Sequence, residues 1–257
     1  MLRFTLLGSG SSGNAILIET ESKKILIDNG LSFKKLSERA KAVGTSIEDL
    51  DAVFITHEHT DHVAGIGVLT RKLPIPIYIT PATMAALPKT VGIVEPIRFF
   101  ESGETVQLGD LLIHSFSISH DAADPVGFTV SHKGLKLGFA TDMGHCSQLV
   151  RTRLAGCHAL LLEANYCPEM LRLGDYPPVI QQRIRSRSGH LSNQDMASLL
   201  SEIQHDALQR VVLVHISENN NHPDKVLQMA KLALKSSTAQ IHLATQDGPT
   251  PFFEVCL

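Results

Sequence analysis

A dense cluster of metal-binding residue types occupies positions 57 to 62. Three imidazoles and one carboxylate share this segment: His57, His59, Asp61 and His62. Imidazole nitrogen and carboxylate oxygen are ligands that suit zinc, manganese and iron. Because side chains at i and i+2 of an extended loop point the same way, His57 and His59 can share one metal ion while the other two reach a second. A polar surface turn is the alternative interpretation, which this density at the end of an apolar run disfavours.

Short apolar runs separated by turns predict the strands that must position this cluster. The runs are 3–7, 15–20, 24–28, 51–56, 97–100, 111–118, 126–131, 135–140, 159–162, 211–214, 240–244 and 252–255. Apolar spacing of three and four residues predicts helices at 32–43 and 223–235, with another directly after position 62. A capping box at 192–195 predicts that a further helix begins there. The alternation favours a mixed α/β fold, and no repeat or long linker divides residues 1–257, so we expect one domain.

Composition and charge limit the location and the partners of the chain. Hydrophobic residues make up 43% and charged residues 19%, which is typical of a globular protein and not of a disordered one. A formal net charge of −3 disfavours a general polyanion binder but leaves room for a local basic patch. We expect neither a signal peptide nor a membrane span, because no suitable apolar stretch opens the chain and none approaches about 18 residues. Four cysteines without a CxxC pair favour a reduced, cytoplasmic protein.

The segment Thr56–His62 resembles the HxHxDH signature of the metallo-β-lactamase fold hydrolases. Three later residues match further motifs of that superfamily in the expected order, each at the end of a strand-like run: His120, Asp142 and His215. Each of these alone is weak, since a lone histidine or a Thr-Asp pair is usually structural, but the ordered set is specific. The resemblance implies an α/β fold of the four-layer αββα sandwich type, with two sheets back to back, helices outside and the site at one edge.

The resemblance also implies a site for two divalent metal ions, Zn²⁺, Mn²⁺ or Fe²⁺. The ligands of the first ion would be His57, His59 and His120. The ligands of the second ion would be Asp61, His62 and His215. Asp142 would bridge the ions, and Asp61 would orient the hydroxide between them. Two ions about 3.5–4 Å apart can activate such a hydroxide as the nucleophile and stabilise the charge of a displacement reaction.

Glu163 and His190 extend the resemblance to the phosphodiesterase branch of the superfamily, which includes ribonuclease Z. Glu163 follows the run 159–162, and His190 lies within the stretch 189–193, before the capped helix. The resemblance implies that His190 is the general acid, which protonates the leaving oxygen, and that Glu163 holds it. A histidine with a pKa of about 6.5 can supply this proton, and a neighbouring carboxylate favours its charged form. The alternative is structural: a helix-terminus histidine and a surface carboxylate.

Longer stretches resemble the YycJ/WalJ group of bacterial metallohydrolases within that branch. The matching stretches are 8–14, 119–127, 163–166, 189–193 and 215–220. This resemblance implies cleavage of DNA by an exonuclease that acts from a 5′ end, with nucleic acid as the partner and no membrane.

Polar and basic side chains beside these motifs are candidates for binding the phosphates of a nucleic acid. They are Arg183, Arg185, Arg187, Ser217, Asn219, Asn220, Ser11, Ser12 and Asn14. Arginine forks bind phosphate in bidentate fashion, and short polar side chains donate hydrogen bonds to its oxygens. A solvated helix face, a polar turn and a hairpin turn are the respective alternatives.

Other substrates stay open for the same constellation of residues. RNA and small cyclic phosphodiesters need the same chemistry. However, the short spacings from 120 to 142 and from 142 to 215 leave no room for the tRNA-gripping arm or the added domain of RNA-processing relatives. A glyoxalase II-like thioesterase or a lactonase shares the HxHxDH signature but does not require Glu163 with His190. A non-catalytic scaffold is disfavoured by the complete set of ligand motifs.

Overall fold

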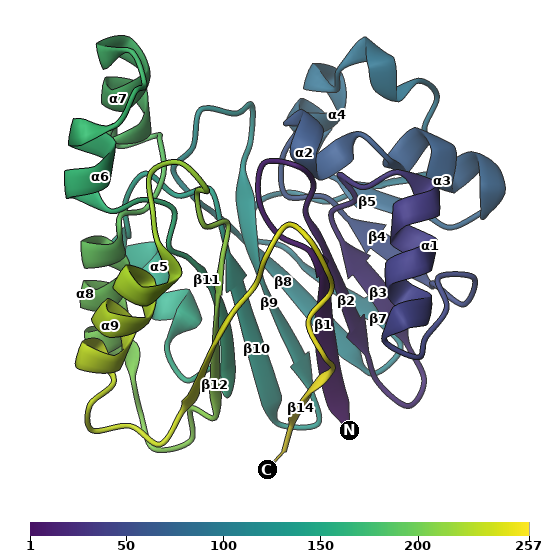
Figure 1. Ribbon diagram of the computed structural model, residues 1–257. Helices are drawn as coiled ribbons and strands as arrows, with labels where there is room; N and C mark the ends of the chain where they lie inside the picture. The colour runs from purple at the N-terminus through teal and green to yellow at the C-terminus, as the bar shows by residue number, and fades with distance from the viewer. Residues whose placement is uncertain (257) are drawn as a thin grey trace.

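Two seven-stranded sheets lie face to face, and helices cover both outer faces, in a computed structural model that describes residues 1–256 (Figure 1). Leu257, the last residue of the predicted 1–257 domain, lies outside the described residues. The strands are β1 (Leu2–Gly8), β2 (Ala15–Glu19), β3 (Lys24–Ile27), β4 (Ala52–Phe54), β5 (Ile77–Ile79), β6 (Ile97–Phe99), β7 (Thr105–Leu108), β8 (Leu111–Ser117), β9 (Val126–His132), β10 (Leu135–Ala140), β11 (Ala159–Glu163), β12 (Arg210–Val214), β13 (Gln240–Leu243) and β14 (Phe253–Val255). The helices are α1 (Phe33–Ala42), α2 (Thr60–Val63), α3 (Ile66–Lys72), α4 (Pro81–Ala86), the 3-10 helix η1 (Lys89–Val91), α5 (Gln148–Leu154), α6 (Pro168–Leu173), α7 (Pro178–Ile184), α8 (Asn193–Ile203) and α9 (Pro223–Ala233).

Each sheet joins an antiparallel part to a parallel part. The first sheet has the order β14-β1-β2-β3-β4-β5-β6, and the second has the order β13-β12-β11-β10-β9-β8-β7. The strands from β3 to β6 run parallel in the first sheet, and those from β10 to β13 run parallel in the second. Parallel strands end at the same edge of a sheet, and in Figure 1 the loops after β4, β11 and β12 lie at the same end of the sandwich.

Apolar side chains from both sheets fill the space between them, because strands covered on both faces are apolar along their whole length. All residues of β2 and of β11 are buried. Phe54 of β4 and Phe128 of β9 meet edge to face across the two sheets, with ring centroids 5.9 Å apart. Burial of each such ring contributes about 1.5–3 kcal/mol to folding. This packing fixes the sheets relative to each other and so sets the distance between their loops.

The predicted four-layer αββα sandwich is confirmed, and every predicted strand run contains a strand. The run 51–56 forms a shorter strand than predicted, Ala52–Phe54, because the chain leaves the sheet there to enter the histidine cluster. The sequence does not predict β5, β7 or the helices α4 to α7, which are short. A single domain over 1–257 stays a prediction, which the shared core supports. Among residues 1–256, no helix combines the length with the apolar character needed to cross a lipid bilayer.

Candidate metal centre

The loop and short helix that follow β4 carry the first group of candidate ligands. His57 and His62 are fully buried, and their ring centroids lie 4.1 Å apart. His59 is the N-cap residue of α2, whereas Asp61 lies within that helix and is partly exposed. The helix packs tightly on the neighbouring loop, since a Cβ added at Gly30 would meet the Asp61 carbonyl oxygen at 1.8 Å. Close packing therefore fixes the position of the cluster.

His62 is fixed from behind by Asp28, which follows β3 and is not among the predicted site residues. Asp28 Oδ2 accepts hydrogen bonds from His62 Nδ1 at 2.7 Å and from Thr56 Oγ1 at 2.8 Å. A proton on Nδ1 leaves Nε2 of His62 to bind a metal ion, as is usual for metal-binding histidines. The backbone of Asp28 has a φ of 60°, a left-handed conformation that aspartate tolerates better than most residues. The sequence does offer one signal, an aspartate directly after an apolar strand.

The second sheet brings three more candidate ligands to the same end of the sandwich. His120 lies between β8 and β9, Asp142 lies two residues after β10, and His215 lies directly after β12. His120 Nδ1 donates to the carbonyl oxygen of Gly189 at 3.0 Å, which turns Nε2 toward His59 Nδ1, 3.2 Å away. Asp142 and His215 have φ values of 56° and 53°, so both leave their strands in a left-handed conformation. Three segments far apart in the sequence thus end at one place.

The seven predicted ligands fall into two groups with Asp142 close to both, and Asp142 and His215 also form a group with Glu163 and His190. Within each group all ligand atoms lie within 4.8 Å of one another, and the groups are His57, His59 and His120, and Asp61, His62 and His215. Asp142 Oδ2 lies 3.2 Å from His62 Nε2, and Asp142 Oδ1 lies 3.1 Å from His215 Nδ1. The same Oδ1 lies 3.9 Å from His120 Nε2. All seven predicted ligands therefore meet in one cluster.

Three buried atoms of this cluster have no hydrogen-bond partner within residues 1–256: His57 Nε2, Asp142 Oδ2 and His215 Nε2. Buried polar atoms are almost always paired, and each unpaired one costs about 1–3 kcal/mol. Nitrogen and oxygen donors of this kind are ligands of zinc, manganese and iron ions. The residues therefore fit two divalent metal ions, which would satisfy all three atoms.

The charges of the cluster favour cation binding. Burial raises the pKa of Asp142, but the adjacent His215 and His62 outweigh burial and hold this pKa well below its usual range. Burial also raises the pKa of Asp61, and His62 and His215 lower it by more, so the net direction is down. Burial and the charge of His62 together hold the pKa of His57 well below its usual value. The carboxylates are thus ionised and His57 is neutral, which are the forms that bind metal ions. Burial lowers the pKa of His62 and of His215, but the neighbouring carboxylates raise both by more, so these two histidines would release protons when metal ions bind.

Glu163, at the end of β11, is fully buried and positions His190. Its Oε1 accepts a hydrogen bond from His190 Nδ1 at 2.7 Å, and its Oε2 accepts from the backbone N–H groups of Met143 at 2.7 Å and Leu191 at 3.2 Å. Burial lowers the pKa of His190, but the charges of Glu163 and Asp142 outweigh burial, so this pKa is raised. Glu163 is therefore not a surface carboxylate, and the pair presents a readily protonated imidazole beside the ligands.

An open pocket of about 310 Å³ exposes this cluster to ligands. Its lining residues are Ser11, His59, Thr60, Asp61, His120, Asp142, Arg183, His190 and His215. Of the predicted phosphate-binding residues, Ser11 and Arg183 line this pocket. Arg183 is held there by Asp121, whose Oδ2 lies 2.6 Å from the guanidinium. Candidate metal ligands, His190 and Arg183 thus share one cavity, called the metal pocket below.

Arg185, Arg187 and Ser12 lie on exposed surface outside the metal pocket. Arg185 Nε donates to the carbonyl oxygen of Gln181 in α7 at 3.4 Å, and Arg187 donates to His145 Nε2 at 3.1 Å. Ser12 lies in the loop between β1 and β2. The three predicted arginines therefore have different partners, and the role of these residues in phosphate binding stays a prediction.

Asn14, Ser217, Asn219 and Asn220 do not line the metal pocket. Asn14 is buried, and its Nδ2 donates to Asp61 Oδ2 at 3.0 Å, so it supports a candidate ligand. Ser217 Oγ accepts a hydrogen bond from the backbone N–H of Asn220 at 3.1 Å, which forms a polar turn after β12. Asn219 is exposed on that turn. Contact of these residues with a substrate stays a prediction.

Comparisons with known proteins agree with this arrangement. The family model of the beta-lactamase superfamily domain matches residues 23–216. Exodeoxyribonuclease YycJ of Bacillus anthracis is 36% identical over 222 residues, which cover 86% of this chain and 84% of that protein. Exodeoxyribonuclease WalJ of Streptococcus pneumoniae serotype 2 (strain D39 / NCTC 7466) is 36% identical over 263 residues, which cover 98% of each.

A solved structure shares the fold over almost the whole chain. The crystal structure of Zn²⁺-bound PqqB from Methylobacterium extorquens matches with a TM-score of 0.74 at 18% identity, and the match covers 96% of this chain and 99% of that one. This likeness shows the fold, whereas the sequence matches show the family. The chain therefore belongs to the metallo-β-lactamase superfamily of hydrolases, and the YycJ and WalJ exodeoxyribonucleases are among its relatives.

Proposed function

We propose that this chain is a two-metal phosphodiesterase that degrades DNA, as an exonuclease acting from a 5′ end. The single observation that carries the proposal is the contact of 2.7 Å between Oε1 of the buried Glu163 and Nδ1 of the partly exposed His190, at the pocket lined by the candidate metal ligands. The names of the YycJ and WalJ relatives, both exodeoxyribonucleases, support DNA as the substrate. The direction of cleavage rests on the resemblance alone.

Each of the two ligand groups would hold one divalent ion, with Asp142 between them. When bound, the ions would activate the attacking water and neutralise charge on the phosphate oxygens. The donor set accepts Zn²⁺, Mn²⁺ or Fe²⁺, and availability commonly decides among such ions. Asp61, which lines the metal pocket, would orient the attacking water with its carboxylate.

His190 would donate the proton that the leaving oxygen needs. An alkoxide leaves a phosphodiester slowly unless a general acid protonates it. Because Glu163 engages Nδ1 of His190, Nε2 is the nitrogen that can reach a substrate in the metal pocket. Burial lowers the pKa of His190 and Glu163 raises it by more, so the acid form is populated nearer to neutral pH. Glu163 is a positioning residue in this scheme.

Arg183 would bind a phosphate of the DNA backbone at the entrance of the metal pocket. Its side chain is 57% exposed and is steadied by Asp121, so the guanidinium can meet a ligand from solvent. A guanidinium fork matches the geometry of phosphate oxygens. Action on DNA also agrees with the cytoplasmic location predicted from the cysteines, all four of which are unpaired within residues 1–256.

Cleavage by wild-type protein and the His190→Ala variant tests this proposal. The substrates are 5′-labelled duplex DNA, matched RNA, a thioester and bis(4-nitrophenyl) phosphate, each with added Mn²⁺. On DNA we expect His190→Ala to be slower by about 10²–10⁴-fold, the usual contribution of a general acid, with metal content unchanged. On bis(4-nitrophenyl) phosphate the loss should be much smaller, because 4-nitrophenolate leaves without a proton.

Each outcome separates one part of the proposal from the others. Full-rate DNA cleavage by His190→Ala would show that His190 is not the general acid. The proposed role of the metal cluster would be unaffected. Activity on RNA with none on DNA would change the substrate. Activity on the thioester alone would replace phosphodiester hydrolysis with the glyoxalase II-like chemistry that Glu163 and His190 disfavour. The order in which labelled products form gives the direction of cleavage.

A further inference from the structure

A second cavity, of about 270 Å³, lies directly beside the metal pocket. The two cavities share a wall, because His215 lines the metal pocket and the next residue, Ile216, lines the second cavity. Ser9 belongs to the same wall, since it lines the second cavity and its Oγ accepts a hydrogen bond from the His215 backbone N–H at 2.9 Å. The two cavities are therefore neighbours, separated by the chain around His215 and Ser9.

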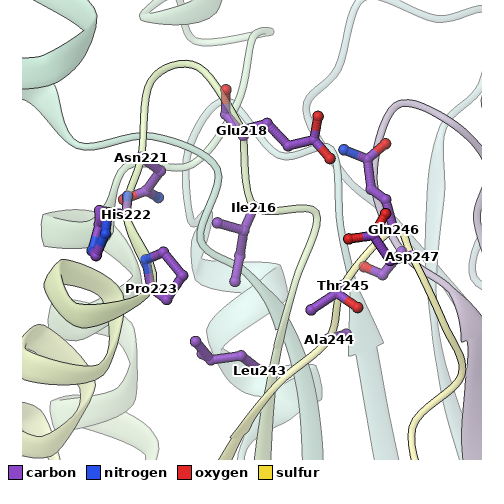
Figure 2. A pocket seen from close by; sticks show the side chains of 12 residues that line it. Ile216, Glu218, Asn221, His222, Pro223, Leu243, Ala244, Thr245, Gln246 and Asp247 are labelled. Carbon is purple, nitrogen blue, oxygen red and sulfur yellow. The ribbon is translucent and has the colours of Figure 1, made fainter.

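The floor of the second cavity is apolar and its rim is acidic. Figure 2 shows Ile216 and Leu243 in the floor, with Glu218 and Gln246 facing each other across the mouth. Asp247 adds a second carboxylate to the lining, and no lysine or arginine within residues 1–256 lines the cavity. The charge of Asp247 is partly offset by Arg39, whose guanidinium donates to the carbonyl oxygen of Gln246 at 2.6 Å. An apolar floor suits the face of a flat ring, whereas the carboxylate of Glu218 repels a phosphate.

The metal pocket has the opposite character, because Arg183 lines it and its ligands would hold two cations. Phosphate is therefore attracted to the metal pocket, and a neutral ring with hydrogen-bond donors is attracted to the second cavity. We propose that the second cavity binds the base of the nucleotide whose phosphate lies in the metal pocket, and that it prefers guanine. This inference rests on the proposed function, because a nucleotide substrate is what connects the two cavities.

The acidic rim favours a base that donates hydrogen bonds. A carboxylate can only accept them, and it accepts best from two donors side by side. Guanine presents such a pair, N1–H and N2–H, on one edge, whereas thymine presents one N–H flanked by two carbonyl oxygens that would face the carboxylate. Glu218 is exposed, and in Figure 2 its carboxylate extends over the mouth of the cavity, where the edge of a bound base would lie.

Binding of nucleosides tests this cavity independently of cleavage. Deoxyguanosine and thymidine carry no phosphate, so calorimetry with the metal-loaded protein reports base binding alone. We expect deoxyguanosine to bind at least about tenfold more tightly than thymidine, the effect of one good bidentate contact. Glu218→Gln should reduce this preference to less than about threefold. The matched control Glu48→Gln changes an exposed glutamate that lines neither cavity and should keep the preference.

A second variant tests where the nucleoside binds. Thr245 is exposed and lines the second cavity, so Thr245→Trp can fill the mouth without disturbing the core. We expect this variant to lose deoxyguanosine binding while its melting temperature stays unchanged. Equal affinities for the two nucleosides, no binding of either, or full deoxyguanosine binding by Thr245→Trp would each overturn the proposal.

DNA cleavage separates this inference from the proposed function. Single-stranded oligonucleotides, in which the N1–H and N2–H edge of guanine is not paired, should show a kcat/KM about tenfold higher with guanine than with thymine at the cleaved position, the same factor as the nucleoside preference. Each kcat/KM is divided by the kcat/KM of the same protein on bis(4-nitrophenyl) phosphate, a substrate that carries no base. DNA cleavage without base preference and without nucleoside binding would overturn the base cavity alone. Selective deoxyguanosine binding without DNA cleavage would overturn the nuclease function alone.

Discussion

The two sheets supply the candidate metal centre in different ways. The first sheet contributes its candidate ligands from one segment, positions 57 to 62, directly after β4. The second sheet contributes one residue from each of three separate segments: His120, Asp142 and His215. The first group needs only a local turn to come together. The second group meets only if several strands are correctly paired, so it depends on the whole sheet.

The register of the parallel strands explains how the second group meets. Ala140 of β10 pairs with Leu162 of β11, and Leu162 pairs with Leu213 of β12. The residues that follow these paired positions by one or two are Asp142, Glu163 and His215. A shift of one residue in this pairing would turn the side chains to the opposite face. Strand register is therefore part of the metal centre on this side of the molecule.

Asp142→Asn should have the largest effect, because Asp142 contacts His62 from the first sheet and His215 from the second. Asparagine tolerates the left-handed backbone at this position, so the variant should fold, but it lacks the charge. We expect DNA cleavage to fall to background and bound metal to be lost, as measured by nuclease assay and elemental analysis. Asp206→Asn, at an exposed position, is the control. Full metal content with full activity would contradict the bridging role.

Asp28→Asn should weaken the first sheet's contribution without abolishing it. The change removes the carboxylate that fixes His62 Nδ1 and leaves all seven candidate ligands in place. Loss of such a supporting contact lowers metal affinity by about 10–100-fold. Titration against a competing chelator should show a larger loss of affinity for one of the two metal ions than for the other. Unchanged affinity for both ions would mean that Asp28 does not position the ligand.

Arg183→Gln should have a smaller effect, confined to DNA binding. We expect weaker affinity for every DNA sequence and a salt dependence reduced by about one unit of slope, because one phosphate contact is lost. Arg185→Gln is the matched control, since Arg185 lies outside the metal pocket. Binding measured across salt concentrations distinguishes the two variants. Equal losses of DNA affinity in the two variants would instead indicate that the arginines act together as one phosphate-binding surface.

Glu19→Gln should have the smallest effect, on stability and not on activity. Burial raises the pKa of Glu19, but Thr45, Arg3 and Lys24 lower it by more, so the folded pKa lies below the usual value. The charge of Glu19 therefore stabilises the fold at pH values above the pKa that this group has in the unfolded chain. This stabilisation is lost as the pH falls through the pKa of Glu19 in the folded protein. We expect the variant to be less stable by about 1 kcal/mol at pH 7.

Urea unfolding at several pH values checks the Glu19 prediction. The difference in unfolding free energy between wild type and variant should shrink as the pH falls below about 4.3, the usual pKa of a glutamate. The rate of DNA cleavage at pH 7 should be unchanged, because Glu19 ends β2 and is not part of the metal cluster. A difference in stability that is constant with pH would contradict the role of its charge.

Local features of this protein were predictable from short stretches of sequence. The helix predicted after the capping box at 192–195 is α8, and Ser192 Oγ accepts a hydrogen bond from the Asp195 backbone N–H at 3.1 Å. The helix predicted at 32–43 is α1, with Ser32 as its N-cap. Both signals depend on contacts within one turn of helix, which the sequence contains completely.

Contacts between distant segments were not predictable in the same way. Asn14 is a candidate for substrate binding in the sequence, but it is buried and donates to Asp61. Asp28 carries no motif, yet it fixes His62. In both cases the partner lies more than 30 residues away, as the separations of 47 and 34 positions show. Such a role exists only after the sheet has paired.

The sequence by itself determined a mixed α/β fold, the candidate metal-binding residue types and their order along the chain, because apolar periodicity and ligand spacing are properties of short segments. The αββα sandwich was implied by the resemblance of the ordered motifs to the metallo-β-lactamase fold hydrolases. Only the tertiary structure decided which arginine lines the metal pocket, which asparagine supports a ligand, and that a second cavity adjoins the centre. These features depend on the pairing of parallel strands and on the packing of loops at their ends. That arrangement is set by burial of the whole core and not by any one stretch of residues.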